Sequence, residues 1–167
     1  MKVPKKIIVF LEKNKIKYEI IKHRTVYTAY DKAQTLKVKP KIIGKTLILK
    51  SDKDLVIALI PGQRKLDKNK FKKTVNFWLL KSGQKPVKSI DFALEQLIKN
   101  KFKGVKIGNI PPFGKLWGLP TFIDKSLIKE KEIILNSGDY NFSIKIKTKE
   151  LKKFDFISGD YLSRQKK

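Results

Sequence analysis

Near the start of the chain, hydrophobic positions recur at helical spacing. Ile7 and Phe10 fall on one face after Pro4, and proline is favoured at the beginning of a helix. Thr28 and Asp31 form a capping-box pattern, which predicts the start of a second helix. Helical spacing or a capping residue predicts further helices over residues 67–73, 89–98 and from 148 onward.

Shorter hydrophobic runs between these segments have the length and composition of strands. Strands are predicted over residues 18–22, 45–50, 55–60, 105–107, 121–124, 132–135 and 142–146. The polar turn 51–54 joins two of them into a hairpin. Because helices are mixed with hairpin-like strands, the pattern predicts an α+β fold with a mixed sheet.

The length of 167 residues favours one domain, and the chain contains no internal repeat and no flexible linker. We assign residues 1–157 to the domain and residues 158–167 to a basic C-terminal tail. The longest apolar run, Leu55 to Ile60, is far shorter than the ~20 residues of a membrane-spanning helix. No secretory signal is recognisable, so we expect a cytoplasmic protein with no membrane partner.

The charge balance points to a polyanionic partner. The formal net charge is +25, and all but three of the 40 cations are lysine. Lysines that displace counterions from phosphates give salt-dependent binding to nucleic acid with little base specificity. Two alternatives are solubility in a salty cytoplasm and attraction to an anionic membrane surface.

Several kinds of chemistry are excluded by composition. The chain has no cysteine, which rules out disulfides, thiol catalysis and cysteine-ligated metals. His23 is the single histidine, so neither a histidine metal site nor a Ser-His-Asp set is expected. We therefore predict no metal and no cofactor.

The segment 108–114, Gly-Asn-Ile-Pro-Pro-Phe-Gly, is the most unusual part of the chain. Glycine permits a positive φ and close approach to the backbone, whereas proline fixes φ. Together they predict a stiff loop with exposed amides that precedes the strand at 121–124. The alternative is a rigid turn with a structural role only.

Five segments, taken in order, resemble the YbaK/ProX family of free-standing aminoacyl-tRNA deacylases, which are related to the editing domain of bacterial prolyl-tRNA synthetase. The resemblance spans roughly residues 5–154. It rests on residues 23–29 (His-Arg-Thr-Val-Tyr-Thr-Ala), 44–47 (Gly-Lys-Thr-Leu), 60–67 (with Ile-Pro-Gly at its start), 108–124 and 136–144.

The resemblance implies a mixed, barrel-like sheet of about seven strands surrounded by helices. It also implies hydrolysis of the ester that joins a wrong amino acid to the 3′ end of tRNA, in the service of translation fidelity. The amino acid is expected to be small, such as Ser, Thr, Ala or Cys. In this family the 2′-hydroxyl of the terminal adenosine is thought to take part.

The catalytic candidates implied by the resemblance are Lys45 and Gly108. Lys45 matches the family's essential lysine, whose ammonium would stabilise negative charge as it develops, whereas an average lysine of this chain is a solvated surface charge. Gly108 and the residues after it would supply backbone amides that orient the ester carbonyl and a water molecule. The substrate-binding candidates are Tyr27, Thr28, Thr46, Asn109, Ile110, Pro111, Pro112, Phe113, Gly114, Asp124, Tyr140 and Ser143.

Three of these assignments have alternatives or depart from the family. Thr28 also fits a helix cap, and Asp124 also fits an ordinary carboxylate at a strand end. Tyr140 stands in the closing hairpin, where many relatives carry a histidine or another strongly polar residue.

Basic stretches are the candidates for contact with the tRNA backbone, and the alternative is that they are solvated faces. They comprise Lys65, Lys68, Lys70, Lys72, Lys73, Lys103 and Lys106. We predict a monomeric trans-editing hydrolase with mischarged tRNA as substrate and an aminoacyl-tRNA synthetase as a further candidate partner. The alternatives are a non-catalytic tRNA-binding or synthetase-associated module, and an unrelated RNA- or membrane-surface protein.

Overall fold

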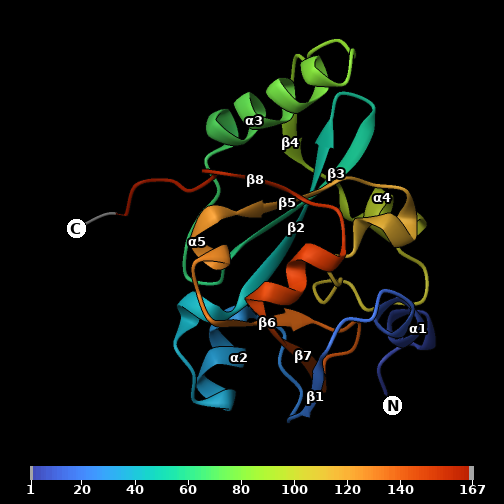
Figure 1. Ribbon diagram of the computed structural model, residues 1–167, viewed down its shortest axis with the longest axis vertical. Helices are drawn as coiled ribbons and strands as arrows, with labels where there is room; N and C mark the ends of the chain where they lie inside the picture. Colours follow the sequence, from blue (N-terminus) through green and yellow to red (C-terminus); the bar gives the residue numbers. More distant parts are fainter. Residues whose placement is uncertain (1, 166–167) are drawn as a thin grey trace.

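The computed structural model describes residues 2–165, which form two β-sheets flanked by helices (Figure 1). The strands are β1 (Glu19–Lys22), β2 (Gly44–Ser51), β3 (Asp54–Pro61), β4 (Ile90–Phe92), β5 (Thr121–Asp124), β6 (Glu132–Asn136), β7 (Phe142–Lys147) and β8 (Ile157–Gly159). The helices are α1 (Lys5–Lys13), α2 (Ala29–Leu36), α3 (Lys68–Lys81), α4 (Glu95–Lys101) and α5 (Lys125–Ile128), with 3-10 turns η1 (Pro40–Ile42), η2 (Gly114–Trp117) and η3 (Thr148–Lys153).

The larger sheet has five strands in the order β4-β2-β3-β5-β8. The predicted hairpin is its centre, with Lys45 opposite Ile60 in the antiparallel pair of β2 and β3. β5 joins β3 in parallel, and β8 joins β5 in parallel. The sheet is therefore mixed, and the predicted α+β class is confirmed.

The smaller sheet has three antiparallel strands in the order β1-β7-β6. A parallel bridge between Ile43 and Ile134 connects it to the start of β2. The expectation of one barrel-like sheet of about seven strands is not confirmed. Residues 2–165 form two sheets of five and three strands, and no closed barrel is found among them.

Two predicted elements are wrong. Residues 89–98 do not form one helix, because Ile90–Phe92 pair with the edge of β2 and the helix α4 starts only after Leu94. The carboxylate of Asp52 holds this turn by accepting bonds from the backbone amides of Lys88 and Ser89. Residues 105–107 form no strand; the amide of Lys106 instead donates to the carbonyl of Gly138 at 2.8 Å.

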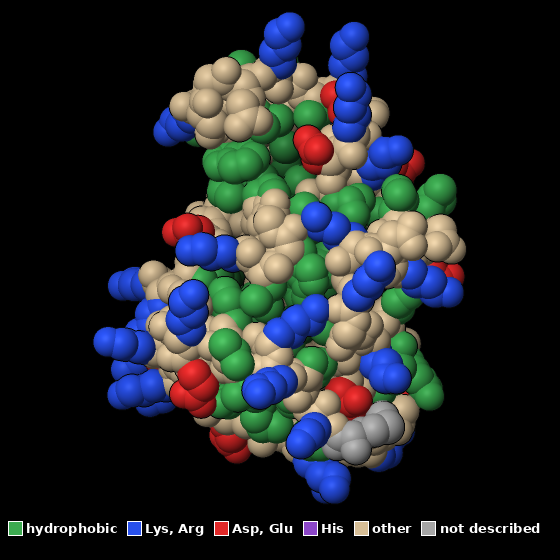
Figure 2. Space-filling model, turned by 90° about the vertical axis from the view of Figure 1, so that its right-hand side faces the viewer, with side chains coloured by type: hydrophobic (Ala, Val, Ile, Leu, Met, Phe, Trp, Pro, Cys, Tyr) green, Lys and Arg blue, Asp and Glu red, His purple; other side chains and the backbone are tan. Residues whose placement is uncertain are grey.

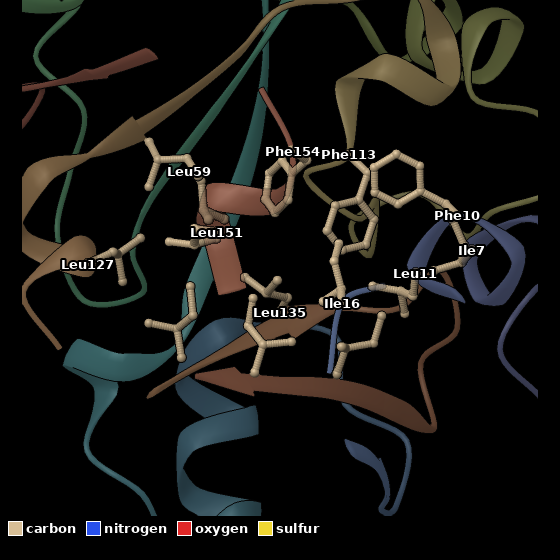
Figure 3. Packing of buried hydrophobic residues seen from close by; sticks show 14 of the residues in the cluster. Ile7, Phe10, Leu11, Ile16, Leu59, Phe113, Leu127, Leu135, Leu151 and Phe154 are labelled. Atoms are coloured by element: carbon tan, nitrogen blue, oxygen red, sulfur yellow. The ribbon is translucent and has the colours of Figure 1, made fainter. Parts of the chain in front are cut away.

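The main core fills the space between the two sheets and α1 (Figure 3). Leu59 enters it from the five-stranded sheet and Leu135 from the smaller sheet. Phe113, from the glycine and proline-rich loop, stacks on Phe10 of α1 with ring centroids 4.9 Å apart. This loop is thus anchored by its own side chain in the centre of the protein.

The C-terminal segment continues the fold further than the sequence suggested. β8 extends the five-stranded sheet, and Tyr161 is fully buried against Phe71 and Phe122. Ser163 donates to the carbonyl of Lys65 at 2.9 Å through its backbone amide. Residues 158–163 of the predicted tail therefore pack on the domain, while residues 166–167 lie outside the described residues. Within the described part of the chain, no helix has the length and apolar character needed to cross a bilayer.

Candidate active site

A cavity of about 300 Å³ lies where α2, the start of β2, the loop at Gly108 and the end of β6 meet. Its walls bring together six of the predicted site residues: Tyr27, Thr28, Lys45, Thr46, Gly108 and Asn109. The other lining residues are Val26, Ala29, Lys32, Gly44, Leu47 and Asn136. Among the described residues, this lining includes two lysines but no carboxylate and no histidine.

Lys45 reaches this cavity from the second position of β2. Its side chain is half-buried, and Nζ donates to the carbonyl oxygen of Arg64 at 2.9 Å. Burial lowers the pKa of Lys45, and the positive charge of nearby Lys65 lowers it further. An ammonium uses only one of its three donors in that bond, so Lys45 has donors left for a substrate oxygen.

The glycine and proline-rich loop is exposed at Gly108 alone, whereas residues 109–114 are buried. Gly108 has a φ of +83° and open space around it, and no hydrogen bond to its amide is found within residues 2–165. Further along, the amide of Gly114 donates to Thr121 Oγ1 at 2.9 Å. The burial of residues 109–114 is what a stiff loop would require, but the prediction of exposed amides holds only at its first residue.

Two side chains, one in the loop and one in the closing hairpin, form hydrogen bonds next to Gly108. Asn109 is 2% exposed, and its Nδ2 donates to the carbonyl of Asp139 at 2.6 Å. Tyr140 donates its hydroxyl to the carbonyl of Ile107 at 2.5 Å, and burial raises the pKa of Tyr140. Tyr140 does not line the cavity; it supports the loop from behind.

The rim of the cavity carries an exposed aromatic ring. Tyr27 is 66% exposed and meets Tyr140 edge-on, with ring centroids 4.8 Å apart. Thr28 lines the cavity and also caps α2, since its Oγ1 accepts a bond from the amide of Asp31 at 3.0 Å. Both interpretations of Thr28 are therefore compatible with the structure.

Other predicted residues do not line the cavity: Ile110, Pro111, Pro112, Phe113, Gly114, Asp124, Tyr140 and Ser143. Asp124 caps α5, and its carboxylate accepts bonds from the amides of Ser126 and Tyr161. Ser143 is buried and hydrogen-bonded to His23 Nε2 at 2.9 Å. These two residues have structural partners outside the cavity.

Sequence reasoning missed Lys32 and Asn136. Lys32, on α2, is 4% exposed, and its Nζ donates to Asn136 Oδ1 at 2.9 Å. Burial lowers the pKa of Lys32 to about 8. Nδ2 of the same asparagine lies 3.3 Å from the carbonyl of Ile110 and 3.5 Å from Thr46 Oγ1. A chain of polar groups thus connects α2, β6, β2 and the loop.

The lysines predicted to contact tRNA fall into two groups. Lys65 lies close to Lys45, and Lys103 and Lys106 lie on the segment that leads to Gly108. The others are at or in α3, where Lys68 pairs with Asp91, Lys70 and Lys72 bind backbone carbonyls, and Lys73 is exposed. Lys and Arg side chains surround the outline of the face shown in Figure 2, where Asp and Glu are few.

A larger cavity, of about 660 Å³, lies between α3 and α4, and none of the predicted site residues lines it. Within the described residues, no group of three or more His, Cys, Asp or Glu side chains is placed to hold a metal ion.

Comparisons with known proteins show similarity in sequence family and in fold. The aminoacyl-tRNA editing domain family matches residues 23–154, which contain every residue that lines the cavity. The crystal structure of the hypothetical protein APE2540 has a TM-score of 0.80 at 18% identity, covering 95% of this chain and all of that one. A "putative trans-editing enzyme for prolyl tRNA synthetase" has a TM-score of 0.75 at 21% identity, covering 95% of this chain and 96% of that one. No curated protein sequence matches the chain.

Proposed function

The chain belongs to the aminoacyl-tRNA editing domain family, also called the YbaK family, as its five motifs predicted. On that premise we propose that it is a trans-editing deacylase, which hydrolyses the ester between a wrong amino acid and the 3′ end of tRNA. The observation that carries the proposal is that one cavity is lined by both Lys45 and Gly108, whose amide has no hydrogen-bond partner within residues 2–165.

The proposed reaction needs little more than positioning and charge stabilisation. Water attacks the ester carbonyl, the bond from that carbon to the ribose oxygen breaks, and the ribose hydroxyl leaves with a proton. The ammonium of Lys45 and the amide of Gly108 would stabilise the negative charge on the carbonyl oxygen. The lining provides no carboxylate or histidine as a general base, which agrees with a role for the substrate's own 2′-hydroxyl.

The rim and its surroundings suit the end of a tRNA. The exposed ring of Tyr27 offers a surface on which the terminal adenine can stack. Lys65, which lies close to Lys45, and Lys103 and Lys106, on the segment that leads to Gly108, would contact acceptor-stem phosphates. The lysines of α3 do not line the cavity and would contact a part of the tRNA backbone that is more distant from the 3′ end.

Release of amino acid from a panel of mischarged tRNAs tests the proposal. The panel carries Ser, Thr, Ala and Cys on proline, alanine and other acceptors, at fixed salt. Wild type is compared with Lys45→Ala and with Lys13→Ala, which removes an exposed lysine of α1 that does not line the cavity. We expect Lys45→Ala to lower kcat by roughly 10²–10³ and Lys13→Ala to leave it unchanged.

A non-catalytic binding module predicts another result. If wild type and Lys45→Ala bind tRNA equally tightly and neither hydrolyses any ester, the deacylase proposal is wrong. If both bind other polyanions as well as tRNA, an unspecific RNA-surface or membrane-surface role is favoured instead.

A further inference from the structure

Lys32 is a buried ammonium without a counter-charge. It projects from α2 into the cavity wall with 4% of its surface exposed. Its one hydrogen-bond partner is the neutral side chain of Asn136, and no carboxylate of residues 2–165 lies within ion-pair distance of it. Burial is the cause of its lowered pKa, with no opposing charge to raise it.

Such an arrangement is costly, since buried charges in proteins are almost always paired. A hydrophobic side chain would fill the same place on α2 at lower cost, as Ala33 does next to it. The two unused donors of the ammonium also remain without a partner in the described part of the chain. A ligand that brings an anion into the cavity would supply both the charge and the acceptors.

The two lysines that line the cavity differ in burial, and this difference indicates a different role for each. Lys45 is half-exposed and stands near Arg64 and Lys65, at the side from which tRNA phosphates would approach. Lys32 is more deeply buried, beside Asn136. In the proposed reaction the ester carbonyl lies against Lys45 and Gly108, and Lys32, which lines the same cavity, is available to the amino-acid side chain.

Asn136 fixes the direction of the Lys32 ammonium. Its Oδ1 accepts from Lys32, while its Nδ2 is oriented by the carbonyl of Ile110 at 3.3 Å. The amide cannot rotate without losing one of these bonds. Lys32 is therefore presented in one orientation, as a selective binding group requires.

We propose that Lys32 is the specificity-determining residue of this cavity and selects acyl groups whose short side chain ends in a carboxylate, as in an aspartyl ester. This inference rests on the proposed deacylase function and names the substrate class of the same site. The carboxylate would accept the free donors of Lys32, in a charge-assisted bond of the strong class. A hydroxyl or amide side chain would accept the same bonds without neutralising the charge.

The test compares esters that differ only in the acyl side chain. Aspartyl, asparaginyl, seryl and alanyl esters of one tRNA are hydrolysed by wild type, Lys32→Met, Lys32→Gln and the control Lys13→Met. Methionine keeps the length without the charge, and glutamine keeps a hydrogen bond to Asn136. Binding of the aspartyl and alanyl amides of 3′-amino-3′-deoxyadenosine, which resist hydrolysis, is measured in parallel by calorimetry.

We expect wild type to prefer the aspartyl ester over the alanyl ester in kcat/KM. Both Lys32 variants should lower this preference by about 10- to 100-fold, since a hydrogen bond to a charged group is at stake. The preference is a ratio of two esters measured with the same protein, so a loss shared by both esters does not change it, and circular dichroism shows whether the variants are folded. Lys13→Met should behave as wild type.

Other outcomes overturn the inference in distinguishable ways. An equal loss on all esters would mean that Lys32 acts on a shared group, such as the terminal phosphate, or on the fold. If wild type hydrolyses all esters at equal rates, the proposed selectivity is wrong, whereas the deacylase proposal is unaffected. If no ester is hydrolysed, the deacylase proposal is wrong. If the aspartyl amide nevertheless binds more tightly than the alanyl amide, and this difference depends on Lys32, then the selection of a carboxylate is correct by itself.

Discussion

The buried charge of Lys32 predicts a pH dependence of stability that needs no substrate to measure. A pKa of about 8 in place of 10.5 means that the unfolded chain binds more protons than the folded chain between these two pH values. Stability therefore rises with pH across this window. Because one pKa unit corresponds to about 1.4 kcal/mol, the protonated ammonium costs the fold about 3 kcal/mol at neutral pH.

The perturbation that isolates this cost is Lys32→Met. The variant cannot titrate at this position, so the difference in unfolding free energy between wild type and variant should move in favour of wild type by about 2–3 kcal/mol from pH 7 to pH 10. Of the titratable neighbours, His23 has its pKa lowered by burial and, in smaller part, by the charge of Lys32, so it titrates below this window. Lys45, whose pKa burial also lowers, is present in both proteins and cancels in the difference.

Urea unfolding at pH 7, 8, 9 and 10 measures this difference directly. Lys13→Met, which removes an exposed lysine from α1, is the matched control and should show a constant difference from wild type. A constant difference for Lys32→Met as well would refute the reasoning, because it would mean that Lys32 is solvated in the folded protein.

Three further predictions concern the loop and the charge. Tyr140→Phe removes the hydrogen bond to the carbonyl of Ile107. We therefore expect the free energy of unfolding in urea to fall by about 1 kcal/mol, and kcat to fall with KM little changed. Unchanged kcat would show that this bond does not position Gly108. Gly114→Ala places a Cβ 2.4 Å from the carbonyl oxygen of Leu119, and thermal unfolding should report a loss of about 1–3 kcal/mol; an unchanged melting temperature would contradict the close packing. Lys65→Ala should reduce the slope of log affinity for tRNA against log salt by about 1, and an unchanged slope would exclude Lys65 from phosphate contact.

The elements that depend on local pattern were predictable from the sequence. The hairpin of β2 and β3 follows from two hydrophobic runs around a polar turn, and α2 begins at the capping threonine as expected. The segment 89–98 shows the limit of this approach. Its hydrophobic spacing is helical, yet the distant carboxylate of Asp52 and the open edge of β2 draw its first part into a strand.

The site was predictable only where a motif marked it. Residues 27–28, 45–46 and 108–109 belong to recognisable segments, and the structure brings them to one cavity. Asp124 lies in a motif too, but its carboxylate is committed to the start of α5 and to Tyr161. Order along the chain cannot tell a residue that faces the cavity from one that supports the strand behind it.

The position of Lys32 on an apolar helical face could have marked it in the sequence, but the large number of lysines in the chain obscured it. Ala29, Lys32, Ala33 and Leu36 recur at the spacing of one helical face, and the three apolar members of this face pack on the bridge between the sheets. A lysine on such a face is unusual in any protein. In a chain of net charge +25 the number of lysines favours a polyanionic partner. The choice of substrate depends instead on the lysines that the hydrophobic pattern turns inward, because a charge that water cannot reach discriminates between ligands far more strongly than one that it solvates.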